Sequence, residues 1–162
     1  GEELGLSDAV VPPERRVDPG GRDGCRAPVP WAPGPAHGWT TADTWLPWPP
    51  AAERRNADVL RADPDSILHL YRRLLAARRR SPALHRGDIA VLPAPEGLLA
   101  YERWSGPDRR LVLVNFTDAP VPFEPDDRWR VEVASYGLGE GAPFDGVVPR
   151  SGALVLLPTG ER

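Results

Sequence analysis

The residues best suited to chemistry gather in one stretch, GRDGCRAPVPW at residues 21–31. Cys25 lies near Arg22 and Arg26, and guanidinium groups beside a thiol can make it a nucleophile. No second catalytic group accompanies it, so a half-buried structural cysteine is the better interpretation. The stretch has no helical or strand period. An arginine-rich segment stiffened by prolines is expected to be a loop that positions something.

Acidic and histidine residues elsewhere offer little further chemistry. Glu2 and Glu3 are adjacent, so in extended backbone their carboxylates point to opposite faces. Asp126 and Asp127 fall in a turn between expected strands. The histidines lack the spacing of metal ligands: His37, His69 and His85. No serine–histidine constellation or phosphate loop stands out, so we expect no metal and no cofactor.

Composition excludes several function classes. The chain has 162 residues and a formal net charge of −3, whereas nucleic-acid-binding domains are usually basic. Mean hydropathy is −0.39 and no long apolar run occurs, so no membrane span is expected. Cys25 is the one cysteine, which rules out an intrachain disulfide. We expect no nucleic-acid or membrane partner and a cytoplasmic location.

The 21–31 stretch belongs to an irregular first segment. Residues 1 to about 56 hold many of the 21 prolines and four of the six tryptophans: Trp31, Trp39, Trp45 and Trp48. Long segments without regular structure are often functional or disordered, and disorder goes with few aromatic residues. We therefore expect an ordered loop that packs onto a larger body.

A helix is predicted next, over DPDSILHLYRRLLAARRRSP at 63–82. Asp63 is the expected N-cap and Pro64 the first helical residue. Arginines 78–80 favour the helix C-terminus, and Pro82 ends the helix. One apolar face is expected from Ile67, Leu68, Tyr71, Leu74 and Leu75.

Short strands are predicted after residue 87. The candidates cover residues 88–92, 97–104, 110–116, 128–135 and 152–158. Within 128–135, Trp129, Val131 and Val133 alternate with Arg130 and Glu132, as in a half-buried strand. Several short strands separated by turn residues favour a small antiparallel sandwich.

Several motifs of the chain resemble those of a known family. GRDGCRAPVPW resembles the loop written GRDGxRTPMxW in the α-glucosidases and oligo-1,6-glucosidases of glycoside hydrolase family 13. GEELGL at 1–6 resembles the segment after their eighth barrel strand, and TWLPWPP at 44–50 resembles their Pro-Trp-Leu-Pro stretch. Residues 55–88 resemble the asparagine–valine start and the final barrel helix. Ala27, Val29 and Ala32 depart from the family pattern, which leaves substrate preference open.

The resemblance implies a fragment with an α+β fold. Residues 1–86 would be the last loop and helix of a (β/α)8 barrel, and residues 87–162 a C-terminal antiparallel β-sandwich domain. Active sites of such barrels lie at the C-terminal ends of the strands. The family cleaves α-glucosidic bonds with retention, using two carboxyl groups. In the family these precede the segment that begins at Gly1, so the catalytic carboxylates and the N-terminal part of the barrel are expected to be missing here.

Site residues follow from the resemblance. The second arginine of the motif helps to hold sugar hydroxyls, and by position this is Arg26, whose planar fork suits that role. The structural alternative is that Arg26 only pins the loop through an ion pair. Arg22, Asp23 and Trp31 are expected to brace the loop. We expect Asp23 to be flanked by both arginines and therefore unsuited to act as an acid.

Two functions stay open at this point. The first is a piece of an α-glucosidase acting on short α-glucosides, inactive by itself. The sequence does not separate maltose, isomaltose, sucrose and trehalose as substrates, nor a hydrolase from a transglycosylase or isomerase. The second is a stand-alone, non-catalytic β-sandwich module that binds carbohydrate or a protein partner.

Overall fold

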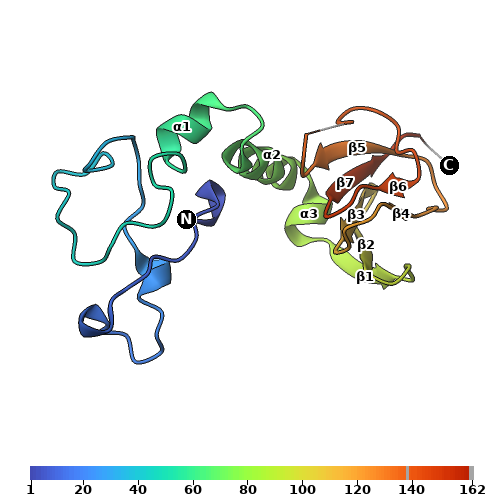
Figure 1. Cartoon of the computed structure of the whole chain (residues 1–162). Helices are drawn as coiled ribbons and strands as arrows, with labels where there is room; N and C mark the ends of the chain where they lie inside the picture. The colour runs from blue at the N-terminus through green and yellow to red at the C-terminus, as the bar shows by residue number, and fades with distance from the viewer. Residues whose placement is uncertain (138, 161–162) are drawn as a thin grey trace. The chain divides into compact units, whose positions relative to one another are not determined.

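The computed structural model describes residues 1–137 and 139–160. It contains two compact units, Gly1–Tyr71 and Arg72–Arg162, which we describe separately (Figure 1). The division falls inside the longest helix, α2 (Ile67–Arg80). The boundary between residues 86 and 87 that the family resemblance implies concerns domains of a parent enzyme, and it stays a prediction.

The first unit is mostly irregular chain, as expected for residues 1–56. Three 3-10 turns interrupt it, η1 (Glu2–Leu4), η2 (Pro13–Arg15) and η3 (Gly24–Arg26). Its buried apolar residues are dispersed along the chain: Leu4, Ala9, Val11, Leu46, Ala52 and Ala57. This ordered but irregular architecture agrees with the expectation from the tryptophan content.

A short helix, α1 (Ala57–Ala62), was not anticipated. It begins at Asn56, which is fully buried and whose side chain accepts a hydrogen bond from the Val59 amide at 3.0 Å. The same side chain donates to the carbonyls of Ala52 and Glu53. Asn56 therefore acts as a strong N-cap and also fixes the preceding turn.

Helix α2 begins later than expected. Asp63 ends α1 instead of capping α2, because its carboxylate accepts from the Asp65 amide at 3.0 Å and closes a local turn. Helical bonds to the Ser66 carbonyl then start α2. The C-terminal expectation holds, since α2 ends at Arg80 and Pro82 opens a separate helix, α3 (Pro82–Arg86), capped by Ser81.

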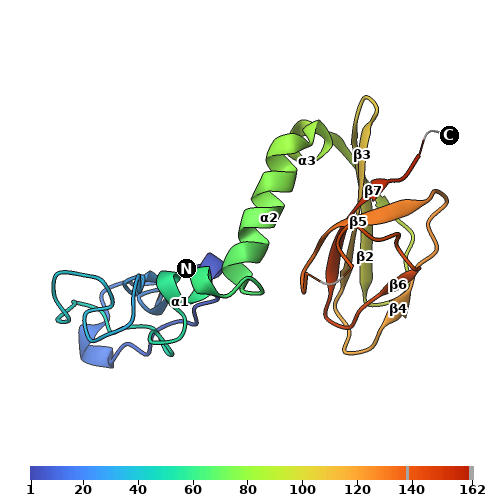
Figure 2. The same ribbon diagram turned by 90° about the horizontal axis from the view of Figure 1, so that it is seen from above.

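The second unit is an antiparallel β-structure (Figures 1 and 2). One sheet has the order β1-β2-β3-β7-β5, and a smaller one pairs β4 with β6. The strands of the larger sheet are β1 (Asp88–Leu92), β2 (Leu98–Ser105), β3 (Asp108–Asn115), β5 (Trp129–Ala134) and β7 (Ala153–Pro158). These match the five predicted strands within two residues. The short strands β4 (Val121–Pro122) and β6 (Val147–Val148) were missed, because two residues show no period.

The core lies between the two sheets. Alternate residues of the larger sheet face it, Val121 and Val148 close it from the smaller sheet, and Phe123 adds to it just after β4. The largest fully buried side chains of this core are Leu111, Leu113, Leu156 and Val148. The expected α+β fold with a small antiparallel sandwich is confirmed, with one layer reduced to a pair of short strands.

A polar network joins α3 to the larger sheet. One oxygen of Asp108 accepts from the Ser81 hydroxyl at 2.5 Å and the Ala83 amide at 2.8 Å. Its other oxygen pairs with Arg110, whose Nε donates to Glu132 at 2.5 Å. The helix is therefore attached through charged groups that satisfy one another.

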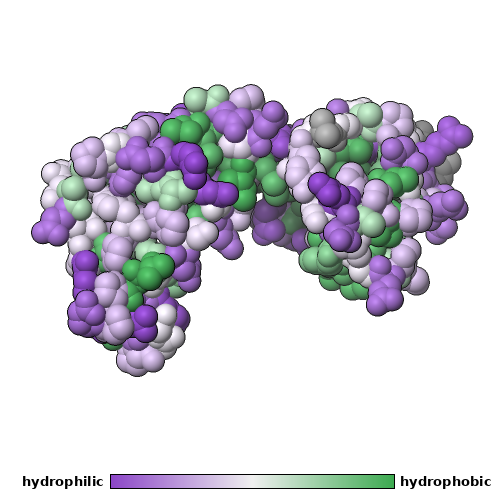
Figure 3. All heavy atoms as spheres, in the orientation of Figure 1, coloured by the Kyte–Doolittle hydropathy of each residue, from purple (hydrophilic) through white to green (hydrophobic). Residues whose placement is uncertain are grey.

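Hydrophobic groups also reach the surface. On the visible face, green residues form separate patches among polar ones (Figure 3). On edge strand β1, Ile89 and Val91 are 60% and 71% exposed. Within the described part of the chain, no helix combines the length and apolar character needed to cross a membrane.

Candidate functional site

The 21–31 stretch forms a loop around η3, organised by one buried carboxylate. Asp23 is 2% exposed. Its Oδ2 accepts from the amides of Val17 at 3.0 Å and Asp18 at 3.1 Å, and its Oδ1 lies 3.2 Å from the Asp18 amide. A buried carboxylate satisfied by backbone donors holds its neighbours firmly. Asp23 therefore ties η3 to residues 17 and 18.

Two glycines allow the loop to close. Gly24 lies against another backbone segment: its carbonyl accepts from the Ala9 amide at 3.1 Å, and a Cβ at Gly24 would stand 2.6 Å from the Ala9 oxygen. Gly21 has open space around it but a φ of 68°, in the left-handed region. The first glycine is required by space and the second by backbone conformation.

The carboxylate of Asp18 pairs with both arginines of the loop. Its carboxylate accepts from Arg22 Nε at 2.8 Å and from the Arg22 amide at 3.0 Å. Arg26 Nη1 lies 3.4 Å from the same oxygen. Hydrogen bonding from Arg22, above all, lowers the pKa of Asp18 to about 2. Asp18 is therefore an anionic anchor and not a proton donor at neutral pH.

The expected pairing of the arginines with Asp23 is therefore wrong. Asp23 turns inward to the backbone amides, which leaves Asp18 as the carboxylate that faces Arg22 and Arg26. Sequence reasoning did not single out Asp18. The signal was present, because Asp-Pro-Gly-Gly at 18–21 is a strong turn sequence with aspartate in its preferred first position.

Arg26 keeps much of its binding capacity. Its side chain is half exposed, and the contact with Asp18 is its one side-chain ion pair or hydrogen bond among the described residues. A guanidinium has five N–H donors, so most of them stay available for a ligand. The loop thus presents a charged, partly tethered donor.

Cys25 does not support nucleophilic chemistry. It is exposed, contrary to the half-buried position expected, because η3 turns its side chain outward. Its thiol donates to the Arg22 carbonyl at 3.0 Å. Beside it lies a cavity of about 210 Å³, whose lining includes Gly24, Ala27 and Val29 together with Glu2 and Ser7.

Polar groups anchor Trp31 at the end of the loop and Trp39 after it. Trp31 is 52% exposed, and its backbone accepts from the Asp58 amide at 3.0 Å and donates to the His37 carbonyl at 2.8 Å. The Trp39 indole donates to the Val29 carbonyl at 2.8 Å. The roles of Arg22, Asp23 and Trp31 in bracing the loop, and of Arg26 in binding sugar, stay predictions.

The histidines do not converge. His37 is buried with a φ of 45°, and its ring meets Trp48 edge-on at 4.6 Å between centroids. His69 lies against the Arg61 carbonyl at 3.1 Å. Among the described residues, no group of three or more histidine, cysteine or acidic residues is arranged to hold a metal ion.

The adjacent glutamates at the start of the chain do not form a catalytic pair. Glu2 accepts from the Tyr71 hydroxyl at 3.3 Å, and Glu3 follows it in the short turn η1. Retaining glycosidases need two carboxyl groups about 5–5.5 Å apart with distinct acid and nucleophile roles. Among the described contacts the Tyr71 hydroxyl reaches Glu2 and not Glu3, so nothing joins the two glutamates in one site.

Comparison with known proteins identifies the family. The family description "Alpha amylase, catalytic domain" matches residues 1–87. The chain belongs to the alpha-amylase family. The match ends just before β1, so it covers the first unit, α2 and α3 but none of the strands.

Curated relatives of this family member are α-glucosidases. The chain is 38% identical over 133 residues to a probable alpha-glucosidase of Rhizobium meliloti (strain 1021), covering 76% of this chain and 24% of that protein. It is 33% identical over 107 residues to a glucan 1,6-alpha-glucosidase of Streptococcus dysgalactiae subsp. equisimilis, covering 65% and 20%. The chain therefore spans a quarter or less of the length of these relatives.

Solved structures agree over nearly the whole chain. The alpha-glucosyl transfer enzyme XgtA matches with a TM-score of 0.80 and 30% identity, over 98% of this chain and 32% of that one. Trehalulose synthase MutB from Pseudomonas mesoacidophila MX-45 gives a TM-score of 0.84 at 22% identity, over 98% and 34%. The second match speaks for the fold alone.

Proposed function

We propose that the chain is part of a retaining α-glucosidase that acts on short α-glucosides, with Arg26 contributing to the glucose-binding subsite. The observation that carries this proposal is the state of Arg26. It is half exposed and tethered only to Asp18 among the described residues, on a loop within the stretch matched by the alpha-amylase family.

The geometry suits transition-state positioning. Asp23 fixes the base of the loop, and Asp18 restrains Arg26 from one side. A guanidinium held in this way can donate to a sugar hydroxyl and to a second oxygen together. Contacts to hydroxyls remote from the bond that breaks contribute to rate by orienting the substrate. The acid and the nucleophile would come from the part of the enzyme that precedes this segment in the family.

Replacing Arg26 in the complete enzyme tests the subsite. We expect Arg26→Ala to lower kcat/KM for an α-glucoside by about 10- to 100-fold, since one charged hydrogen-bond donor is lost. Arg79→Ala is the matched control, because Arg79 is an exposed arginine at the end of α2 with no described ion pair. Equal losses in both variants would contradict the subsite role.

A further variant separates substrate binding from loop bracing. Arg26→Lys keeps the charge near Asp18 but loses the planar fork. If Arg26 binds sugar, Arg26→Lys stays impaired in kcat/KM although its melting temperature matches the wild type. Recovery of activity by lysine would instead support a purely electrostatic anchor.

We also propose that this chain alone hydrolyses no α-glucoside, since the acid and the nucleophile would come from the part that precedes this segment in the family, and Glu2 and Asp23 are hydrogen-bonded to Tyr71 and to backbone amides. The test is release of p-nitrophenol from p-nitrophenyl α-glucoside by the purified 162-residue chain. Turnover that is lost in Glu3→Ala or Asp23→Ala would overturn the proposal. The reading frame upstream of the Gly1 codon offers a second check, because the proposal requires it to encode the catalytic carboxylates.

One observation favours the non-catalytic module as a second candidate. The core of the second unit is built from its own strands. The two candidates differ in the behaviour of the first unit once the chain is purified. A soluble monomer with one cooperative melt would support the module. An aggregating chain would support the enzyme piece, because exposed apolar side chains of the first unit such as Trp39 and Trp45 then need a cover.

A further inference from the structure

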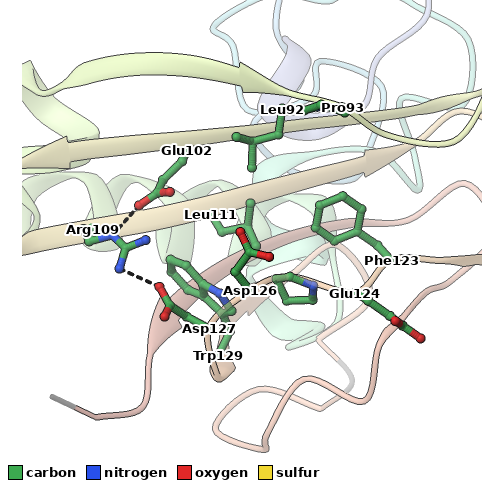
Figure 4. Close-up of a pocket in the computed structure, with 11 residues that line it drawn as sticks. Leu92, Pro93, Glu102, Arg109, Leu111, Phe123, Glu124, Asp126, Asp127 and Trp129 are labelled. Carbon is green, nitrogen blue, oxygen red and sulfur yellow. Dashed lines mark hydrogen bonds and ion pairs between the residues drawn. The ribbon is translucent and has the colours of Figure 1, made fainter. Parts of the chain in front are cut away.

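The second unit contains a hollow that the proposed function does not use. Its volume is about 600 Å³, and it lies between β1–β3 and the segment that leads into β5 (Figure 4). Its floor is apolar: Leu111, Phe123 and Trp129 are 1%, 9% and 4% exposed, and Leu92 adds to them from β1. Ligand pockets of small molecules commonly enclose about 300–1,000 Å³ over such a floor.

The walls are strongly acidic. Four carboxylates and one guanidinium line the hollow: Glu102, Glu124, Asp126, Asp127 and Arg109. Arg109 donates from Nε to Glu102 and from Nη1 to Asp127, the latter at 2.8 Å. These hydrogen bonds, that of Glu102 first, raise the pKa of Arg109. Arg109 therefore stays charged, but it offsets only part of the negative charge.

Arg109 also shows which chemistry the walls accept. Its Cζ lies 5.4 Å from the centroid of the Trp129 ring, within cation–π range. A guanidinium on a short aliphatic stem is thus already held here by two carboxylates and an indole. The hollow is large enough for a second group of this kind.

Two carboxylates are available for that second group. Neither Glu124 nor Asp126 makes an ion pair or hydrogen bond with another described residue. In Figure 4 the Asp126 carboxylate stands beside Leu111 over the floor, whereas Glu124 is directed outward at the rim. An unpaired carboxylate beside apolar surface favours a cationic ligand with an apolar body.

We infer that this hollow binds a small organic cation, an aliphatic chain ending in a guanidinium or ammonium group. The charged end pairs with Asp126, Glu124 adds negative charge at the rim, and the stem covers Leu92, Phe123 and Trp129. Both carboxylates are exposed, so a neutral sugar would gain no ion pair from them, whereas a cation would. A metal ion is disfavoured, because the described carboxylates do not form a coordinating group.

Calorimetric titration with butylguanidinium tests the inference, on the 162-residue chain or, if that chain aggregates, on the second unit alone, whose core is built from its own strands. We expect binding with a Kd of about 1 mM at low ionic strength, the range open to a ligand of few atoms. Asp126→Asn should weaken it about threefold to tenfold, and adding Glu124→Gln should weaken it further. Asp118→Asn is the matched control: it removes the same charge from an exposed loop residue outside the hollow and should leave Kd unchanged.

Three comparisons make the result decisive. Raising the salt concentration should weaken butylguanidinium binding, since exposed charges are screened. Maltose should not bind measurably at the same concentrations, and binding of maltose but not butylguanidinium would overturn the inference. A blocked Ala-Arg-Ala peptide tests the source of the cation. If the peptide binds about tenfold more tightly than butylguanidinium, the hollow serves a partner protein's arginine and not a free small cation.

Discussion

The two units of this chain are each stabilised internally by different interactions. The second unit buries a contiguous apolar core between its sheets, with Leu113 and Leu156 fully buried. The first unit has dispersed buried apolar residues, and its irregular backbone is fastened by buried polar side chains such as Asp23 and Asn56. Burial of apolar area stabilises a whole body, whereas a buried hydrogen-bonded side chain stabilises the segment it touches.

This difference predicts how far the destabilising effect of a substitution extends within each unit. Losing apolar volume from the sandwich core affects every strand that shares it. Losing one polar anchor in the first unit releases a loop and leaves the rest of its unit in place. Three predictions test this contrast, and amide hydrogen exchange resolves it residue by residue.

The largest effect is expected in the sandwich core. Leu113→Ala should destabilise the second unit by about 2–5 kcal/mol, because Leu113 is fully buried and truncation leaves a cavity. Exchange should accelerate across β2, β3 and β7 together. The matched control is Leu99→Ala on β2, a position 37% exposed, with an expected loss below about 1 kcal/mol. A comparable loss at Leu99 would show that the core is not the main support.

A smaller and more local effect is expected at Asp23. Asp23→Ala leaves the amides of Val17 and Asp18 without their acceptor, which should cost about 1–3 kcal/mol. Those two amides should exchange faster while the amides of β3 keep their protection. Asp43→Ala, at an exposed residue of the same unit, should change neither group. Loss of protection throughout the second unit would break the contrast between the units.

The smallest effect depends on pH. Burial acts to raise the pKa of Asp108, but hydrogen bonds from Ser81, Ala83 and Arg110 bring it below its ordinary value of 3.8. A depressed pKa in the folded state stabilises the fold above about pH 4, and this stabilisation is lost as pH falls through the folded pKa. Asp108→Asn should cost about 1 kcal/mol at neutral pH and flatten the acid limb of stability.

Urea unfolding at several pH values, followed by circular dichroism of the sheet, measures this effect. Asp88→Asn is the control, since Asp88 is exposed and its side chain makes no described ion pair or hydrogen bond. If Asp108→Asn retains the full acid dependence of the wild type, the network between α3 and the sheet is not its source.

Much of the second unit was predictable from sequence, because its strands carry a period. Trp129, Val131 and Val133 alternate with polar neighbours, and β5 appears where this pattern lies. The register beyond Val131 was not predictable. A bulge between Val131 and Val133 lets Val133 pair with Val155, and such irregularities depend on the partner strand.

The first unit was predictable only in outline. Composition located its loop, but the sequence did not reveal which aspartate pairs with the two arginines. Asp23 lies directly beside Arg22, whereas Asp18 lies between Val17 and Pro19, so proximity in sequence favours the wrong aspartate. The path of the backbone turns Asp23 inward and leaves Asp18 facing the arginines. The missed helix α1 has six residues, too few to display a clear apolar face.

The two glycines of the 21–24 turn have a consequence at the level of the gene. Any amino acid reached from a glycine codon by a single base change carries a Cβ. At Gly21 that atom meets open space, so such a change costs backbone strain that a residue tolerant of positive φ, such as aspartate, can partly absorb. At Gly24 the Cβ meets the Ala9 carbonyl at 2.6 Å, and no choice of residue avoids it. No single-base substitution at codon 24 is therefore expected to be tolerated unless the chain segment at Ala9 also moves. At codon 21 a few substitutions are expected to be tolerated.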